Sequence, residues 1–323
     1  MRSFRIIHPL LLLPFALAFT LAMAQNNDSG PLLLGKANRP QRSPVNSPAA
    51  DLKVNVNMTL VPVTVLDGMG RSVTGLTPKN FRVFDNSHQV PIASFARQDQ
   101  PIAVGLVFDC SRSMADKFRN EREAPHQLFQ QLGEQDQSFL VTVSDRAALR
   151  TPLTADLRDI ADQLVFTYPT GTTPLLDGVH LGLAELRKSR LTRKALVVVS
   201  DGGDNNSRYT LHEIDELAAE SEAQIFTILL YKDPQAPEEV TGPDLLAHLA
   251  GRSGGVNFVI QNIEDIHQVM AKIGISLHNE YVLGYYVPEG GRSGQYRKIA
   301  VQLLVPPGTP RLLIHARQGY YAP

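Results

Sequence analysis

The spacing of apolar positions divides the chain into three regions. Residues 51–100 contain stretches such as Val54–Leu60, in which apolar and polar residues alternate as they do in half-buried strands. Residues 102–278 instead alternate wholly apolar runs, such as Ala195–Val199, with amphipathic segments, which indicates buried parallel strands joined by helices. Alternating strands return over residues 280–323. The pattern predicts an α/β fold: a doubly wound, mostly parallel sheet with helices on both faces, flanked by two sets of β-strands.

Each element of the central region is expected from its own apolar pattern. The expected strands are Ala103–Phe108, Ser138–Val143, Ala195–Val199, Ile225–Leu230 and Val256–Ile260. The expected helices are Met114–Gln131, Asp156–Leu164, Pro174–Leu186, Thr210–Glu222, Asp244–Ala250 and Ile263–His278. Pro125 should kink or split the first of these helices, because proline lacks a backbone N–H and its ring clashes with the preceding turn.

The two flanking sets of strands are each too small to bury a core alone. We therefore expect residues 51–100 and 280–323 to form one small β-sandwich. An α/β domain of residues 101–279 would then be inserted into that sandwich, an arrangement favoured when the ends of a domain lie close together. The alternative is that the two sets are separate β extensions packed on the α/β domain.

The N-terminus has the composition of a targeting segment. A basic start that includes Arg2 precedes the apolar run Leu10–Leu21, and small residues around Ala24 fit the cleavage rule of secretory signal peptides. We expect a signal peptide over residues 1–24, then a disordered linker over residues 25–50, which is rich in Asn, Ser, Pro and Gly. The mature protein would be exported, either periplasmic or secreted. The alternative is an uncleaved membrane anchor, for which the apolar run is short.

Composition excludes several function classes for this chain. The formal net charge is −1 and no long cluster of Lys and Arg is present, which argues against a nucleic-acid partner. No second hydrophobic stretch follows the first, so no transmembrane segment is expected after signal cleavage. The single cysteine, Cys110, cannot form an intramolecular disulfide and is expected to be a small buried residue.

Three polar loops are expected at one edge of the predicted sheet. Asp109–Ser113 directly follows a buried strand, Gly171–Leu175 leads into a helix, and Ser200–Asp204 follows the most apolar strand. Open α/β sheets bind their ligands beyond the carboxyl ends of the strands. Carboxylate and hydroxyl oxygens spaced two residues apart can converge there on one small hard cation, for which Mg²⁺ is well suited.

The three loops read D-C-S-R-S, G-T-T-P-L and S-D-G. Together they resemble the metal-ion-dependent adhesion site of von Willebrand factor type A domains, whose pattern is D-x-S-x-S, then G-x-T-x-L, then S-D-G. This resemblance covers about residues 100–280. The segments Val61–Val65, Gly75–Phe81 and Arg317–Pro323 are similar to the flanks of a bacterial family of exported proteins related to this domain.

The resemblance implies a metal site without catalytic residues. The implied ligands of the ion, which would be Mg²⁺ or in its place Mn²⁺ or Ca²⁺, are Asp109, Ser111, Ser113, Thr173 and Asp201. Thr172 is the alternative to Thr173, which is preferred because it occupies the third position of the G-x-T-x-L pattern. Asp204 is implied only as a neighbour that orients waters or the third loop, and is otherwise an ordinary turn residue. Asp116 stands where some related domains have a ligand of a second ion, and is otherwise a solvated residue of a helix face.

The function implied is that of a binding module rather than an enzyme. An exported protein-interaction or adhesion domain of this kind captures an Asp or Glu of a protein partner on its cation. Neutral hydroxyl ligands suit this role because they leave the cation able to accept an outside carboxylate. One alternative is a metal-dependent, phosphatase-like hydrolase, although such sites usually place a second carboxylate where Ser111 stands. Another is a structural envelope protein in which the ion only stabilises the fold.

Overall fold

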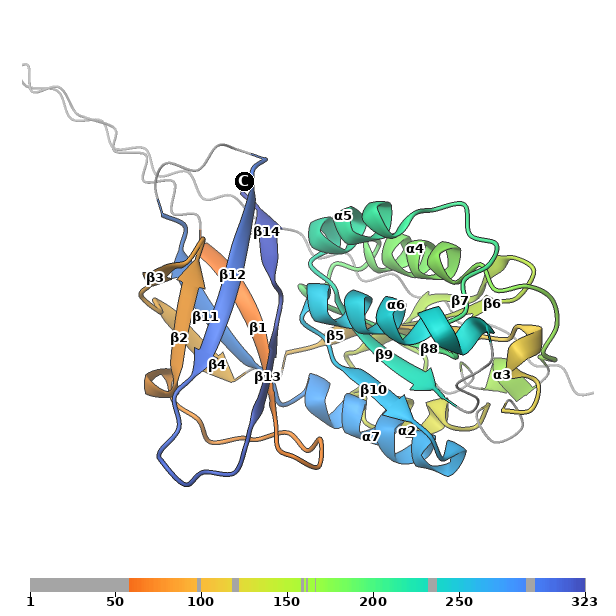
Figure 1. The fold of residues 1–323 in the computed structure, drawn as a ribbon, viewed down its shortest axis with the longest axis horizontal. Helices are drawn as coiled ribbons and strands as arrows, with labels where there is room; N and C mark the ends of the chain where they lie inside the picture. The colour runs from red at the N-terminus through yellow and green to blue at the C-terminus, as the bar shows by residue number, and fades with distance from the viewer. Residues whose placement is uncertain are drawn as a thin grey trace, which may run out of the picture. The chain divides into compact units, whose positions relative to one another are not determined.

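Over the residues that the structure describes, the chain forms one six-stranded sheet and two four-stranded sheets (Figure 1). The expected signal peptide and linker lie outside the residues that the structure describes. The structure is a computed structural model, and it describes residues 58–97, 100–117, 122–157, 160, 162–165, 167–231, 237–288 and 294–322.

The six-stranded sheet has the order β10-β9-β8-β5-β6-β7. Its strands are β5 (Ile102–Asp109), β6 (Gln137–Val143), β7 (Ala147–Thr154), β8 (Arg193–Ser200), β9 (Gln224–Leu230) and β10 (Asn257–Ile260). All neighbours pair in parallel except β6 and β7. Of these six strands, β5 comes first in the sequence. It lies inside the sheet, because later strands are added on both of its sides. The sheet is therefore doubly wound and mostly parallel, as the sequence predicts.

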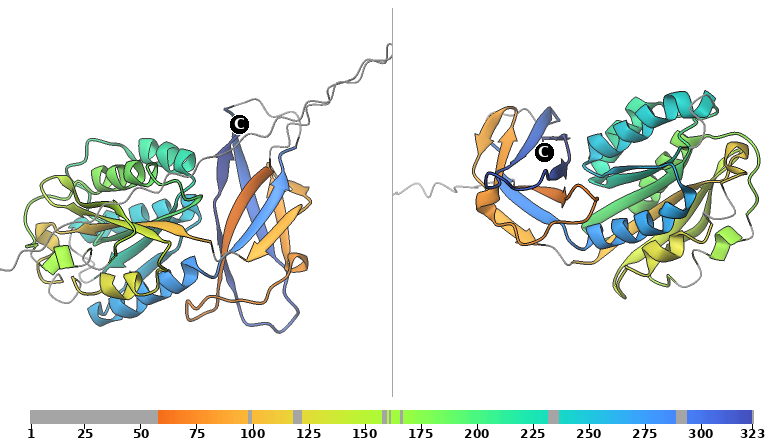
Figure 2. Two further views of the ribbon diagram at one scale, coloured as in Figure 1. Left: turned by 180° about the vertical axis from the view of Figure 1, so that it is seen from behind. Right: turned by 60° about the horizontal axis from the view of Figure 1, so that its bottom comes forward.

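Helices cover both faces of this sheet (Figures 1 and 2). One face carries α4 (Leu175–Leu186), α5 (Leu211–Ser221) and α6 (Pro237–Ser253), and the other carries α2 (Pro125–Phe129), α3 (Asp162–Val165) and α7 (Ile266–Leu277). Successive residues of a strand point to opposite faces, so each strand supplies both layers of the core. Leu106 of β5 thus belongs to the apolar cluster of α2 and α7, whereas Val107 belongs to that of α4.

The predicted helices are present but differ in extent. In place of the helix expected over Met114–Gln131 with a kink or a split at Pro125, the structure describes a 3-10 turn, η2 (Arg112–Met114), and then α2, which begins at Pro125. Proline fits the first helical turn, where its missing N–H needs no partner, so it starts the helix instead of kinking it. The helix expected from Asp156 is described only over α3, and the one expected over Asp244–Ala250 extends across the whole of α6.

The two smaller sheets combine strands from both ends of the chain. They contain β1 (Met58–Leu66), β2 (Phe81–Asp85), β3 (His88–Val90), β4 (Ser94–Arg97), β11 (Tyr281–Tyr286), β12 (Tyr296–Leu303), β13 (Leu313–Ala316) and β14 (Gly319–Tyr321). Their orders are β13-β1-β11-β4 and β14-β12-β2-β3, and a common apolar cluster joins them into a sandwich. Strand β4 leads into the α/β region and β11 follows it. These two strands are antiparallel neighbours, with Arg97 opposite Tyr281.

The beginning and the end of the α/β region are held by one side chain. Arg193, the first residue of β8, donates a 2.8 Å hydrogen bond to the carbonyl of Gln100 and another to the carbonyl of Leu277. Its guanidinium also lies 2.9 Å from the buried carboxylate of Glu280, which accepts a 3.3 Å hydrogen bond from Thr64. The incoming and outgoing chain segments are therefore tied to the same residue of a central strand.

A buried carboxylate organises the interior of the sandwich. Asp85 of β2 is fully buried and accepts 2.9 Å hydrogen bonds from the hydroxyls of Tyr285 and Tyr320, on β11 and β14. It also accepts a 2.7 Å hydrogen bond from Nε of Arg297 on β12. Burial raises the pKa of the Tyr285 hydroxyl, with a further contribution from its hydrogen bond with Tyr320. One carboxylate thus joins strands of both sheets and of both ends of the chain.

The substitution Asp85→Asn tests this role. It removes the charge that balances the buried guanidinium of Arg297, and breaking a buried ion pair from one side costs about 3–5 kcal/mol. Urea unfolding should therefore show a free energy of unfolding that is lower by about 3–5 kcal/mol. Glu220→Gln is the matched control, because Glu220 and Arg187 form an ion pair at 3.9 Å in which both side chains are well exposed. The control should change stability by less than about 1 kcal/mol, and an equally small effect of Asp85→Asn would contradict the assignment.

Candidate metal centre

The three polar loops meet at the carboxyl ends of β5 and β8. These strands pair in parallel up to Phe108 opposite Val199, so Asp109 and Ser200 end neighbouring strands. After β5 the chain adds strands on one side of the sheet, and after β8 it adds them on the other. The site therefore lies at the topological switch point of the sheet, where open α/β folds bind their ligands.

The first loop folds back on the carboxylate of Asp109. Oδ1 of Asp109 accepts a 2.9 Å hydrogen bond from the backbone N–H of Ser111, and the hydroxyls of Ser111 and Ser113 lie 3.1 Å apart. The 3-10 turn η2 makes this possible, because it turns the chain directly after Ser111. Asp109 and Ser111 are almost fully buried. Cys110 is buried as well, within the apolar core, as expected from the sequence.

The third loop is joined to the first by a side-chain hydrogen bond. Ser200 Oγ donates to Oδ2 of Asp109 at 2.6 Å. The next residue, Asp201, is also buried, and its Oδ1 accepts a 3.4 Å hydrogen bond from the N–H of Gly203. Gly202 has φ +89° in this turn, and a Cβ there would lie 2.4 Å from the Cα of Gly242. Glycine is therefore required to bring the turn against α6.

The second loop is held to both of the others by backbone contacts. The N–H of Arg112 donates to the carbonyl of Gly171 at 3.2 Å, which joins it to the first loop. The N–H of Thr173 donates to the side chain of Asn205 at 2.9 Å, and the N–H of Asn205 donates to the carbonyl of Thr173 at 3.1 Å, which joins it to the third loop. Thr173 is 2% exposed, whereas Thr172 is exposed and its hydroxyl accepts a 3.2 Å hydrogen bond from Asn206.

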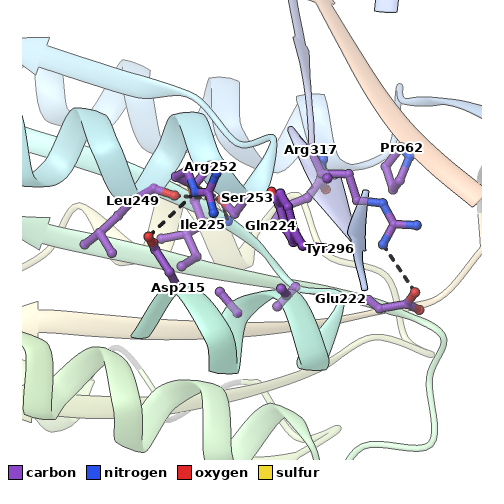
Figure 3. Close-up of a pocket in the computed structure, with 14 residues that line it drawn as sticks. Pro62, Asp215, Glu222, Gln224, Ile225, Leu249, Arg252, Ser253, Tyr296 and Arg317 are labelled. Atoms are coloured by element: carbon purple, nitrogen blue, oxygen red, sulfur yellow. Dashed lines mark hydrogen bonds and ion pairs between the residues drawn. The ribbon is translucent and has the colours of Figure 1, made fainter. Parts of the chain in front are cut away.

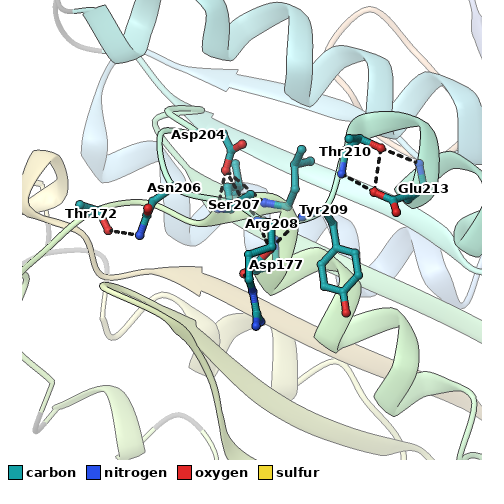
Figure 4. A network of polar contacts seen from close by, with 11 residues as sticks. Thr172, Asp177, Asp204, Asn206, Ser207, Arg208, Tyr209, Thr210 and Glu213 are labelled. Carbon is teal, nitrogen blue, oxygen red and sulfur yellow. Dashed lines mark hydrogen bonds and ion pairs between the residues drawn. The ribbon is translucent and has the colours of Figure 1, made fainter.

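Asp204 fixes the start of the helix that follows the second loop (Figure 4). Its Oδ1 accepts hydrogen bonds from the backbone N–H groups of Leu175 and Leu176, at 2.8 and 3.4 Å, and from the hydroxyl of Ser207 at 2.5 Å. A carboxylate at the N-terminus of a helix pairs with N–H groups that have no partner within the helix. Asp204 thereby sets the position of α4 and of Thr173 two residues before it.

Some features of this centre were not predicted from the sequence. Lys117 is 7% exposed and its Nζ lies 3.3 Å from Oδ2 of Asp201, although lysine side chains are usually exposed to solvent. Ser200 was recognised only as part of the S-D-G motif, and its bond to Asp109 depends on which strands are neighbours. Asp116 is exposed, and its suggested role beside a second ion stays a prediction.

The donor chemistry of the centre fits a divalent cation that prefers oxygen ligands. Among the residues that the structure describes, no group of three or more His, Cys, Asp or Glu side chains is arranged to hold a metal ion. A cation at this edge would therefore depend on hydroxyl oxygens together with Asp109 and Asp201. Burial, and then the nearby charge of Asp201, raise the pKa of Asp109 to about 7. A bound cation would relieve this repulsion, so the residues present suit the ion that the motif implies.

A small hollow lined by other residues differs in character from this centre (Figure 3). It has a volume of about 30 Å³, which is room for about one water. Its polar side chains are already paired: Arg252 Nε lies 3.6 Å from Asp215, and Arg317 lies 3.2 Å from Glu222. The guanidinium of Arg252 also lies 5.2 Å from the ring centroid of Tyr296. These pairs make the hollow a packed contact between elements and not a ligand site.

The raised pKa of Asp109 makes the stability of the metal-free protein depend on pH. The folded chain keeps a proton on Asp109 up to about pH 7, whereas the unfolded chain releases it near 3.8. In chelator, the free energy of unfolding should therefore fall as the pH rises between these values, by about 1.4 kcal/mol for each unit of pKa shift. Urea unfolding of the wild type and of Asp109→Asn isolates this contribution. A difference between the two that does not change from pH 4 to pH 7 would contradict the raised pKa.

Part of the chain matches a known family model. Residues 104–203 match the model of the von Willebrand factor type A domain, and this range includes all the proposed ligand positions from Asp109 to Asp201. None of the curated proteins matches the chain.

Solved structures with a similar fold were also found. A von Willebrand factor type A protein from Catenulispora acidiphila is 13% identical, with a TM-score of 0.48 over 83% of this chain and 73% of its own. The conserved hypothetical protein BatB from Bacteroides thetaiotaomicron is 17% identical, with a TM-score of 0.46 over 54% of this chain and 98% of its own. The vWF domain of the type V pili tip protein Mfa5 from Porphyromonas gingivalis is 11% identical, with a TM-score of 0.45 over 56% of this chain and 96% of its own. On the family match, this chain contains a von Willebrand factor type A domain.

Proposed function

We propose that this protein is an exported binding module that captures an acidic side chain of a protein partner through a divalent cation, Mg²⁺ or in its place Mn²⁺ or Ca²⁺. The observation that carries the proposal is the joining of three loops, far apart in sequence, around two buried carboxylates. The residues that would hold the ion are Asp109, Ser111, Ser113, Thr173 and Asp201.

The choice of donor groups supports capture of a ligand over permanent enclosure of an ion. Only Asp109 and Asp201 carry charge, and the hydroxyl groups are neutral. When bound, the cation would supply residual positive charge and a ligand position open to an outside oxygen. The chain itself orients the donors: the N–H of Ser111 and the hydroxyl of Ser200 fix the two oxygens of Asp109, at 2.9 and 2.6 Å.

The same contacts disfavour a phosphatase-like hydrolase. In such enzymes an aspartate attacks the phosphorus, and a second acidic group assists. Here both oxygens of Asp109 already accept hydrogen bonds, and the residue two positions later is Ser111. The nearby Lys117 points to Asp201. An arrangement that orients and shields the carboxylate suits a ligand of an ion better than a nucleophile.

Export remains part of the proposal on the evidence of the sequence. The basic start and the apolar run Leu10–Leu21 fit a signal peptide that is cleaved after Ala24. In the part of the chain that the structure describes, no helix has both the length and the apolarity needed to cross a membrane. We place the mature protein in the periplasm or outside the cell.

Adjacent threonines provide a matched test of the metal site. Thr173→Val removes a buried hydroxyl that the proposal makes a ligand, whereas Thr172→Val removes the exposed hydroxyl beside it. Titration calorimetry with MgCl₂ should detect a single site in the wild type and in Thr172→Val, and at least about tenfold weaker binding in Thr173→Val, because one oxygen ligand is lost. If Thr172→Val binds Mg²⁺ more weakly than Thr173→Val does, the second loop presents the hydroxyl of Thr172 to the ion. If neither change affects binding, the loop holds no ion.

Capture of a carboxylate can be tested with the partner. Proteins retained from an envelope extract of the source cells in MgCl₂, and released by chelator, are identified, and their acidic residues are changed singly to the matching amides. One such change should abolish retention while the partner stays folded. Retention in excess chelator, or retention of every amide variant, would contradict the mechanism. Magnesium-dependent turnover of p-nitrophenyl phosphate, lost in Asp109→Asn, would instead favour the hydrolase.

A further inference from the structure

The centre already contains a positive charge of its own. Lys117 lies three residues beyond η2, and its side chain is 7% exposed. Its Nζ lies 3.3 Å from Oδ2 of Asp201 and 3.0 Å from the carbonyl of Leu230, the last residue of β9. The side chain thus runs from the first loop to the third loop and to the end of the next strand.

The surroundings of this ammonium group explain why it can be buried. An ammonium group is buried at acceptable cost only when it is paired and hydrogen-bonded. Lys117 has both kinds of partner, the carboxylate of Asp201 and the carbonyl of Leu230. Asp201 in turn has each of its oxygens occupied, one by Lys117 and the other by the N–H of Gly203 at 3.4 Å. The position of the third-loop carboxylate is therefore fixed by contacts within the chain.

The charge of the group matters as much as its hydrogen bonds. Asp109 and Asp201 are close enough for the charge of one to raise the pKa of the other. Once a cation has displaced the proton of Asp109, the two ionised carboxylates and the ammonium of Lys117 together carry a single net negative charge. A divalent cation would turn that into a single net positive charge, whereas without Lys117 the same cation would give a neutral centre.

We propose that Lys117 is a positioning residue of this centre: a resident cation that holds Asp201 in place without metal and keeps the metal-loaded centre positive. The proposal rests on the proposed function, since it assigns Lys117 a role toward the same ion and the same acidic ligand. Its two effects have opposite signs. Lys117 should weaken the binding of the divalent cation by repulsion, and it should strengthen the attraction of the loaded centre for a carboxylate.

The positioning role is tested without any metal. Unfolding temperatures are measured in excess chelator for the wild type, Lys117→Met, Asp201→Asn and the double variant. Lys117→Met should lower the midpoint by about 5 °C or more, because Asp201 loses its counter-charge. The double variant should be more stable than the sum of the single effects predicts, because it leaves neither charge unpaired. If Lys117→Met alone does not fold but the double variant does, the result supports the same pairing of Lys117 with Asp201.

Further variants separate charge from hydrogen bonding. Lys117→Gln retains a donor for the carbonyl of Leu230 but has no charge, and it should behave like Lys117→Met. Lys117→Arg retains the charge and should remain closer to the wild type than either. Additive effects in the double variant, or a wild-type midpoint for Lys117→Gln, would overturn the proposal, because Lys117 would then act only through Leu230 or through packing.

The effect on metal is measured with MgCl₂ alone. Titration calorimetry at low salt should show about tenfold tighter binding by Lys117→Gln than by the wild type, since a neighbouring positive charge is removed. Equal or weaker binding by the variant would overturn the electrostatic role. If the wild type itself binds no magnesium, the proposed function fails, but the chelator experiment still decides whether Lys117 holds Asp201.

Discussion

The hydrogen bond from Ser200 to Asp109 is the contact on which the centre depends. It joins the ends of two neighbouring parallel strands at the point where the loops that follow them leave in opposite directions. The bond length of 2.6 Å and the full burial of both groups indicate a strong interaction in a dry environment. The serines of the first loop and the turn that carries Asp201 directly follow this pair in the chain, whereas the second loop is held to them by contacts of Arg112, Asn205 and Asp204.

The sequence was sufficient to predict the five parallel strands of the six-stranded sheet, because their signals are local. Apolar runs such as those of β5 and β8 allow few interpretations other than buried strands, and Thr210, at which a helix is expected to begin, is the N-cap of α5 in the structure. The three loops could be placed at one edge for the same reason, since parallel strands end on the same side. The extents of the helices follow from the sequence less closely. Pro125 is predicted to kink or split a helix over Met114–Gln131, and in the structure it begins the shorter helix α2.

The details of the centre that escaped prediction depend on contacts distant in sequence. Lys117 and Asp201 are 84 positions apart, and nothing near Lys117 in the chain indicates that its ammonium group is buried. Asp204 looked like an ordinary turn residue or a possible partner of water, because its acceptance of hydrogen bonds from α4, 28 and 29 positions earlier, depends on how the third loop folds over the second. In both cases a polar side chain is placed by the tertiary structure and not by its local pattern.

The pairing of β4 with β11 gives the α/β region an unusual place in the topology. In the sandwich these are adjacent antiparallel strands, so the whole α/β region between them occupies the position of a hairpin loop. A flexible loop of that length would add an entropic cost to pairing the two strands, although this cost grows only slowly with loop length. The folded α/β region removes this cost, and Arg193 contributes by holding Gln100 and Leu277 to the same residue. The sandwich therefore has reason to fold second, with the completed α/β region serving as its turn.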